Sequence, residues 1–242
     1  MYKGIYRIAD TVLEIDSLYP RVQEMCLDYR AEGEPEVRIV TGQAEVDRER
    51  ELGEKNPEEG AGHFPDDYLE TLAVYRKIAE WMLHHDTLLF HGSVVAVDGS
   101  AYLFTAASGT GKSTHTRLWR QLLGDRAVMV NDDKPLLKVR EDGVWACGTP
   151  WNGKHHLSTN ISVPLRAICI LERGAENEIH EISAKEMLPM LMQQSYRPAS
   201  PRDYPVYLTL LDKLAGQMKF CRLHCNMEPE AARISYNCLS RG

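Results

Sequence analysis

The segment Ser108 to Thr114, SGTGKST, carries the residue types with the clearest chemical use in this chain of 242 residues. Its two glycines let a loop turn successive backbone N–H groups toward a bound anion. A lysine adds a positive charge, and the serine after it stands where such a loop contacts Mg²⁺. The segment therefore predicts a phosphate-binding loop made of Ser108, Gly109, Thr110, Gly111, Lys112, Ser113 and Thr114.

The residues on either side of this loop follow the order strand, loop, helix that nucleotide binding requires. Tyr102–Thr105 is an apolar, β-prone run, and Thr114–Leu123 has the apolar side of a helix that stops at Gly124. Ala106 stands where the Walker A pattern has its first glycine. A glycine-rich turn that caps an ordinary helix is therefore the alternative interpretation.

A β-hairpin is expected directly before the loop. Asp98-Gly99 separates the β-prone runs Leu88–Val97 and Ser100–Thr105, and Asp-Gly between two such runs is a strong hairpin signal. In the common parallel-sheet nucleotide-binding enzymes an isolated strand enters the loop. A hairpin at this place therefore indicates a different family that binds phosphate in the same way.

An acidic pair, Asp132-Asp133, lies further along the chain. It follows the apolar run Ala127–Val130 and Asn131. One carboxylate could contact Mg²⁺, and the other could accept the proton of an attacking hydroxyl group. Asn-Asp-Asp is also favourable turn chemistry, so a simple turn is the alternative. The position after a phosphate-binding loop and its helix favours the functional interpretation.

Taken together, His91-Gly92, the hairpin, the loop and Asn131-Asp132-Asp133 resemble the HPr kinase/phosphorylase family, whose fold is related to ATP-dependent phosphoenolpyruvate carboxykinase. The resemblance implies an α/β fold with a mixed sheet, ATP and Mg²⁺ as cofactors, and the capacity to form homo-oligomers. It covers about residues 88 to 140, under a quarter of the chain.

The same resemblance implies a role for each matching residue. Lys112 and Ser113 would bind the β- and γ-phosphates and Mg²⁺, and Asp133 would lie nearer the metal. Asp132 would act as general base, and His91, which composition alone would assign to the core, would lie beside the transferred phosphate. In the segment Trp151–His156, Lys154 could neutralise transition-state charge, although a solvated loop lysine is equally expected there.

Three functions fit these features. The first is an ATP-dependent kinase that acts on a hydroxyl group of a peptide, a protein or a small molecule. The second is a carboxykinase-like enzyme that acts on an oxyacid. The third is a nucleotide-binding module without catalysis, whose ATP state controls a partner.

Composition limits the partners and the compartment. A net charge of −7 argues against sequence-independent nucleic-acid binding, and no apolar run approaches the ~20 residues that span a bilayer. Six scattered cysteines and an N-terminus without a signal-peptide pattern predict a cytoplasmic protein with free thiols. The segment Cys221–Cys225 is expected to be a buried strand rather than a metal site.

Two domains are expected. Residues 1–63 predict a small α+β lobe that ends in a polar linker over residues 42–63, and residues 64–242 predict the kinase-like domain. Two helix starts carry the spacing of a capping box, Asp67 with Glu70 and Ser183 with Glu186.

Overall fold

The computed structural model describes residues 1–55 and 64–241, which form two compact units divided after Met82. The sequence placed this boundary after residue 63. In the structure, helix α3 (Asp66–Leu83) belongs almost entirely to the first unit. Its Glu70 is fully buried and accepts hydrogen bonds from the backbone N–H groups of Leu18 and Tyr19 and from the Thr41 hydroxyl. Glu70 therefore anchors α3 to the first unit and does not close the expected capping box.

The first unit is a three-stranded sheet with helices. Strand β2 pairs antiparallel with β1 and parallel with β3. The elements of this unit other than α3 are β1 (Tyr2–Ile8), β2 (Thr11–Ser17), α1 (Arg21–Met25), the 3₁₀ turn η1 (Leu27–Tyr29), β3 (Val37–Val40) and α2 (Gln43–Lys55).

Helix α2 corrects the expectation of a polar linker over residues 42–63. The segment is rich in charge, but most of its residues favour helices, and its Glu49 is buried. Both carboxylate oxygens of Glu49 accept hydrogen bonds from Arg76 of α3, at 2.5 and 2.8 Å. The charged residue Glu49 therefore holds α2 against α3 and does not keep this segment in solvent as a linker. The rest of the expected linker, residues 56–63, lies outside the described residues.

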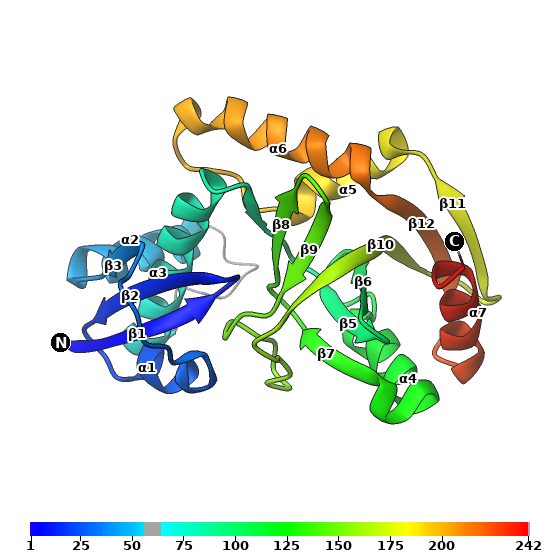
Figure 1. Cartoon of the computed structure of the whole chain (residues 1–242), viewed down its shortest axis with the longest axis horizontal. Coiled ribbons are helices and arrows are strands. Elements are labelled where there is room, and N and C mark those ends of the chain that lie inside the picture. The colour runs from blue at the N-terminus through cyan, green and yellow to red at the C-terminus, as the bar shows by residue number, and fades with distance from the viewer. Residues whose placement is uncertain (56–63, 242) are drawn as a thin grey trace. The chain divides into compact units, whose positions relative to one another are not determined.

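The second unit is built on a curled mixed sheet in the order β4-β8-β9-β10-β6-β5-β7, with β12 pairing to β10 and β11 to β12 (Figure 1). The strands are β4 (Thr87–Leu89), β5 (Ser93–Val97), β6 (Ser100–Thr105), β7 (Ala127–Asn131), β8 (Leu136–Arg140), β9 (Gly143–Cys147), β10 (Ser162–Arg173), β11 (Glu178–Ile182) and β12 (Lys219–Cys225). The mixed α/β class that the sequence predicts is thus present, and residues 221–225 lie in a strand as expected.

The hairpin before the loop is confirmed. Strands β5 and β6 pair antiparallel, and Asp98 and Gly99 between them have φ of 49° and 79°. Two consecutive positive φ values are what a tight hairpin turn requires, which explains the Asp-Gly sequence. On its other side β6 pairs parallel with β10, so the segment that enters the loop is a central strand.

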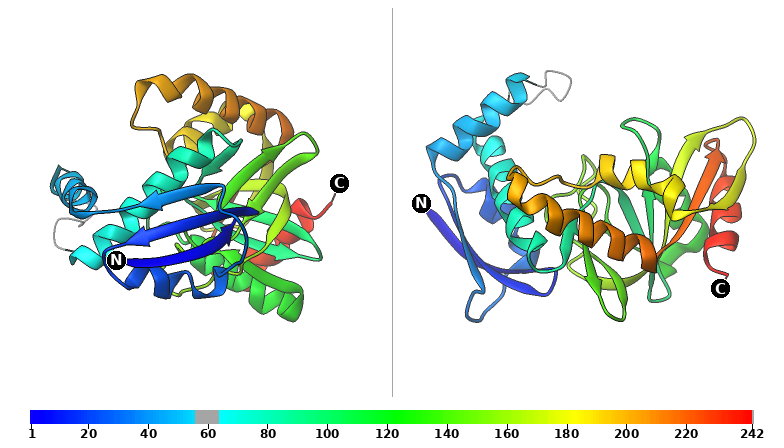
Figure 2. Two further views of the ribbon diagram at one scale, coloured as in Figure 1. Left: turned by 60° about the vertical axis from the view of Figure 1, so that its left-hand side comes forward. Right: turned by 90° about the horizontal axis from the view of Figure 1, so that it is seen from above.

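Helices cover both faces of this sheet. Alternate residues of β5 point to opposite faces, and each set packs against different helices. Val94 and Ala96 belong to a core with α5 and α6, whereas Val95 and Val97 belong to a core with α4 and α7. Figures 1 and 2 show α6 on the side of the sheet opposite α4. The helical segments are α4 (Lys112–Leu123), η4 (Gly124–Arg126), α5 (Ala184–Gln194), η5 (Pro201–Asp203), α6 (Tyr204–Gln217) and α7 (Pro229–Leu239).

Within the described part of the chain, no helix combines the length and the apolar character that crossing a membrane demands.

Candidate active site

The glycine-rich loop joins the end of β6 to the first residue of α4. Gly109 and Gly111 have φ of +74° and +124°, a backbone region that other residues rarely adopt. Gly111 is the N-cap of α4, and no described side chain caps the helix there or adds an acidic group to its first turn. The first N–H groups of α4 are therefore free for an anion, and the helix dipole favours negative charge at this end.

Two further contacts hold this loop. Arg173, at the end of β10, donates a 2.6 Å hydrogen bond to the Gly109 carbonyl. Lys112 folds back over the loop and donates to the Ala106 carbonyl at 3.1 Å. Ala106 is fully buried and does not have a positive φ, so alanine fits at this place. Burial lowers the pKa of Lys112, and the charge of Asp133 opposes that shift.

Asn131 shapes the turn that carries the acidic pair. Its Oδ1 accepts the backbone N–H groups of Asp133 and Lys134 at 2.8 and 2.6 Å. Its Nδ2 donates to the carbonyl and the hydroxyl of Thr149, both at 3.0 Å. The sequence indicated a turn here, and the structure shows that Asn131 also ties it to the segment after β9. The turn and the functional interpretations of Asn-Asp-Asp are therefore compatible.

Asp132 is only 4% exposed, and its two carboxylate oxygens differ. Oδ1 accepts the backbone N–H of Gly153 at 2.6 Å, while Oδ2 is buried without a hydrogen-bond partner among the described residues. Burial raises the pKa of Asp132, and the Gly153 hydrogen bond partly offsets the effect. An acid with a raised pKa is a stronger base once it is ionised, and its second oxygen is free to take a proton.

Asp133 pairs with His91, whose Nε2 lies 3.3 Å from Asp133 Oδ1. Burial opposes ionisation of Asp133, but the His91 hydrogen bond and the charges of Lys134 and Lys112 outweigh it and lower its pKa. The backbone also fixes the pair, since the Gly92 N–H donates to the Asp133 carbonyl at 2.9 Å. The two neighbouring aspartates thus have pKa values shifted in opposite directions, which is typical of carboxylates with different tasks.

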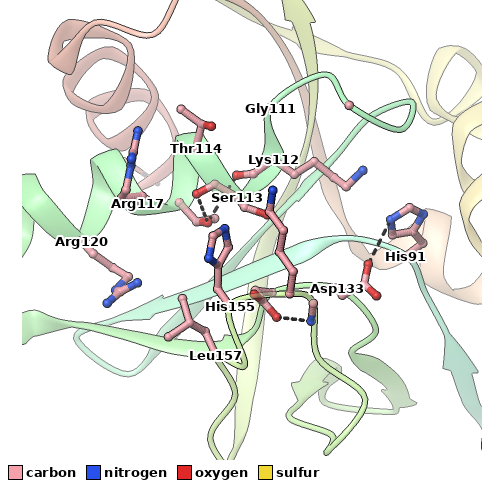
Figure 3. Close-up of a pocket in the computed structure, with 15 residues that line it drawn as sticks. His91, Gly111, Lys112, Ser113, Thr114, Arg117, Arg120, Asp133, His155 and Leu157 are labelled. Carbon is pink, nitrogen blue, oxygen red and sulfur yellow. Dashed lines mark hydrogen bonds and ion pairs between the residues drawn. The ribbon is translucent and has the colours of Figure 1, made fainter. Parts of the chain in front are cut away.

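One pocket of about 790 Å³ brings these groups together (Figure 3). Its lining combines the loop and α4 with the acidic turn, His91 and the segment after β9: His91, Gly109, Gly111, Lys112, Ser113, Thr114, Thr116, Arg117, Arg120, Asp132, Asp133, Gly153, Lys154, His155 and Leu157. Of the expected site residues, Ser108 and Thr110 do not line it. Trp151 is buried elsewhere, whereas Lys154 of the same segment does line it.

Several residues of this pocket were not expected from the sequence. Arg117 and Arg120 follow Ser113 at helical spacing, and that spacing was the available signal. Two residues outside the pocket lining hold its parts in place. Arg173 donates to the Gly109 carbonyl, and the Thr149 carbonyl accepts from Asn131. Nothing in the sequence indicated either contact.

A second pocket, of about 470 Å³, adjoins the other side of the loop. It shares Gly109, Gly111 and Thr114 with the first and is otherwise lined by less charged groups, among them Leu118, Leu171 and Met227.

Fold and site together define a mixed α/β protein in which a glycine-rich loop, between a central strand and a helix, lines one pocket with an acidic pair, of which Asp132 is buried. Residues 68–212, more than half of the chain, match the family described as SynChlorMet cassette protein ScmC. The chain belongs to this family.

Other comparisons add a distant likeness. The solved structure of the Hpr(Ser) kinase/phosphatase from Coxiella burnetii is similar over 62% of this chain and 95% of its own, with 10% identity and a TM-score of 0.35. A search of curated proteins gave no match.

Proposed function

We propose that this chain is a phosphotransferase that moves the γ-phosphate of ATP to a hydroxyl group. The observation that carries the proposal is the convergence of Lys112 and Ser113 with Asp132 and Asp133 in one pocket. Phosphoryl transfer needs mainly groups that hold the phosphates and one group that accepts the proton of the attacking hydroxyl. The pocket offers candidates for both, with Lys112 and Ser113 for the phosphates and Asp132 for the proton.

The open N-terminus of α4 and the Lys112 ammonium would bind the β- and γ-phosphates. Mg²⁺ prefers oxygen ligands and usually binds to one or two protein groups plus the phosphates. The Ser113 hydroxyl and the ionised Asp133 fit this preference, and the described residues contain no cluster of three His, Cys, Asp or Glu side chains that would form an all-protein metal site. When bound, the metal would neutralise charge on the phosphates.

Asp132 would act as the general base through Oδ2. The acceptor oxygen forms a bond to the γ-phosphorus while the bond from that phosphorus to the β-phosphate oxygen breaks. The hydroxyl proton passes to Asp132, and ADP leaves with the bonding electrons. Gly153 keeps the other oxygen of Asp132 in place, and His91 orients Asp133. Lys154 would stabilise the charge on the transferred group.

Radiolabelled ATP tests this proposal directly. The purified protein is incubated with γ-labelled ATP, Mg²⁺ and a cell extract, and the labelled product is separated from phosphate. Asp132→Asn should lose the transfer and still bind ATP, whereas Lys112→Ala should lose both. If Asp132→Asn transfers label as wild type does, catalysis by Asp132 is excluded. If wild type binds ATP and transfers nothing, a non-catalytic nucleotide-binding module is the better description.

A further inference from the structure

One side of the large pocket is basic. Arg117 and Arg120 lie three residues apart on α4, where side chains share a helix face, and both line the pocket together with Lys154 and His155. Figure 3 shows Arg117 and Arg120 on the α4 side, away from His91 and Asp133. The pocket therefore has an acidic wall, which the proposed chemistry uses, and a basic wall at Arg117 and Arg120, which it does not.

Arg117, Arg120 and Lys154 have no charged partner within residues 1–55 and 64–241. Neither Arg117, Arg120 nor Lys154 forms an ion pair or a side-chain hydrogen bond there. Some arginines of the second unit do have carboxylate partners, as Arg126 has Asp98 and Arg222 has Glu172. Although the chain has a net charge of −7, these three unpaired cations line one and the same pocket. They make the basic wall attractive to an anion.

The nucleotide alone does not account for this wall. Its terminal phosphates would be held at the first turn of α4, by Lys112 and by the metal. Arg120 is seven residues beyond Ser113, which places its backbone about 10 Å further along the helix axis. Arginine forks bind carboxylates and phosphates through two parallel hydrogen bonds, so the pair is suited to a second oxyanion.

We propose that the acceptor is a small hydroxyl compound that carries its own carboxylate or phosphate group, which Arg117 and Arg120 hold while its hydroxyl faces Asp132. This inference rests on the proposed phosphotransfer. Asp132 lines the same pocket, and its Oδ2 has no hydrogen-bond partner among the described residues, so its carboxylate has an oxygen left for the hydroxyl. A volume of about 790 Å³ lies in the range of small-molecule sites, which favours a small acceptor over a folded protein.

Calorimetric titration tests the inference on the full chain, saturated with Mg²⁺ and a non-hydrolysable ATP analogue. The probes are glycerol, glycerate and glycerol 3-phosphate, which share the hydroxyl groups and differ in the anion. A serine peptide with acidic flanks is the fourth probe. The test variant is Arg117→Gln/Arg120→Gln. Its control is Arg202→Gln, which changes an exposed arginine outside the pocket.

We expect that glycerate or glycerol 3-phosphate binds and glycerol does not, and which of the two binds identifies the anion. The double variant should lose about tenfold or more of that affinity, and Arg202→Gln should lose none. Equal binding of glycerol, binding of the peptide alone, no binding of either acid, or an unchanged double variant overturns the inference.

Binding of the ATP analogue is measured first and separates the two proposals. If wild type does not bind the analogue, the phosphotransfer proposal fails, and the inference fails with it. If wild type and the double variant both bind the analogue and the acids do not bind, only the anionic acceptor is excluded. Circular dichroism melting of each variant checks that α4 tolerates glutamine at these two positions.

Discussion

The backbone N–H of Gly153 donates a 2.6 Å hydrogen bond to Asp132 Oδ1 and leaves Oδ2 buried without a described partner. A Cβ atom at residue 153 would lie 3.2 Å from that same Oδ2. Glycine is therefore needed at this place for two reasons, the close approach of the backbone and the space beside the free oxygen. The segment after β9 thus sets the position of the group that we assign as the base.

Gly153→Ala is expected to impair transfer more than nucleotide binding. The added methyl group must displace the Asp132 carboxylate by a few tenths of an ångström, and misplacement of a reacting group lowers kcat by about ten- to a hundredfold. Steady-state kinetics and ATP titration measure the two effects. Gly216→Ala in α6 is the matched control, because a Cβ there meets nothing within 4 Å. Equal kcat values for both variants would contradict this role of Gly153.

The rate of transfer should rise with pH through the pKa of Asp132. A general base works only when it is ionised, and burial raises the pKa of Asp132 above the usual aspartate range. The ascending limb of the kcat profile should therefore lie above that range. Asp132→Asn should remove this limb together with about 10²- to 10⁴-fold of the rate. A residual activity of Asp132→Asn that keeps the same ascending limb would assign the limb to another group.

Lys112→Met should raise the free energy of unfolding and abolish ATP binding. Lys112 is 9% exposed, its ammonium donates a hydrogen bond to the Ala106 carbonyl, and burial disfavours its charge. A methionine of similar length removes the buried charge, so the free energy of unfolding should rise by roughly 1 kcal/mol. ATP binding should be lost at the same time. Chemical denaturation and nucleotide titration test this, and a destabilised variant that binds ATP would refute it.

His115 should make the protein sensitive to acid. Its ring is buried between α4 and α7, with Nε2 3.0 Å from Ser235 Oγ, and burial lowers its pKa to about 3. Because the folded pKa lies below the unfolded value of about 6.5, the stabilisation is complete above pH 6.5 and is lost as pH falls toward 3.

The contribution of His115 to the free energy of unfolding should change by up to about 1.4 kcal/mol per pH unit in this window. His115→Gln removes the titration, so its stability should fall less steeply than that of wild type between pH 6 and pH 4. Denaturation curves at several pH values measure the difference. If the free energy of unfolding depends on pH in the same way in both proteins, His115 does not change its protonation on unfolding.

The sequence predicted features whose cause is local and missed those whose cause is distant. The Asp98-Gly99 hairpin was predictable because both residues tolerate positive φ. The Ser183–Glu186 capping box formed as expected. The same spacing at Asp67 and Glu70 did not form one, because Glu70 instead accepts three hydrogen bonds from residues that are far away in the chain.

The candidate site divides in the same way. The loop and the acidic pair could be found from residue types and order, and His91 only from the resemblance to HPr kinases. The structure brings most of these residues to one pocket. The basic wall was not found, because Arg117 and Arg120 belong to no motif and gain meaning only when Lys154 and Asp132 line the same pocket. The hydrogen bond from Gly153 to Asp132 likewise joins two segments that the sequence does not link.

Transfer of the terminal phosphate to an acceptor can be measured by comparing wild type with Asp132→Asn. Wild type and Asp132→Asn are each incubated with γ-labelled ATP, Mg²⁺ and glycerate or glycerol 3-phosphate, and labelled acceptor is quantified beside ATP binding. We expect labelled acceptor from wild type only, with ATP bound by both proteins. Labelled acceptor in equal amounts from both proteins, or ATP bound by neither, would show that this chain does not transfer phosphate through Asp132.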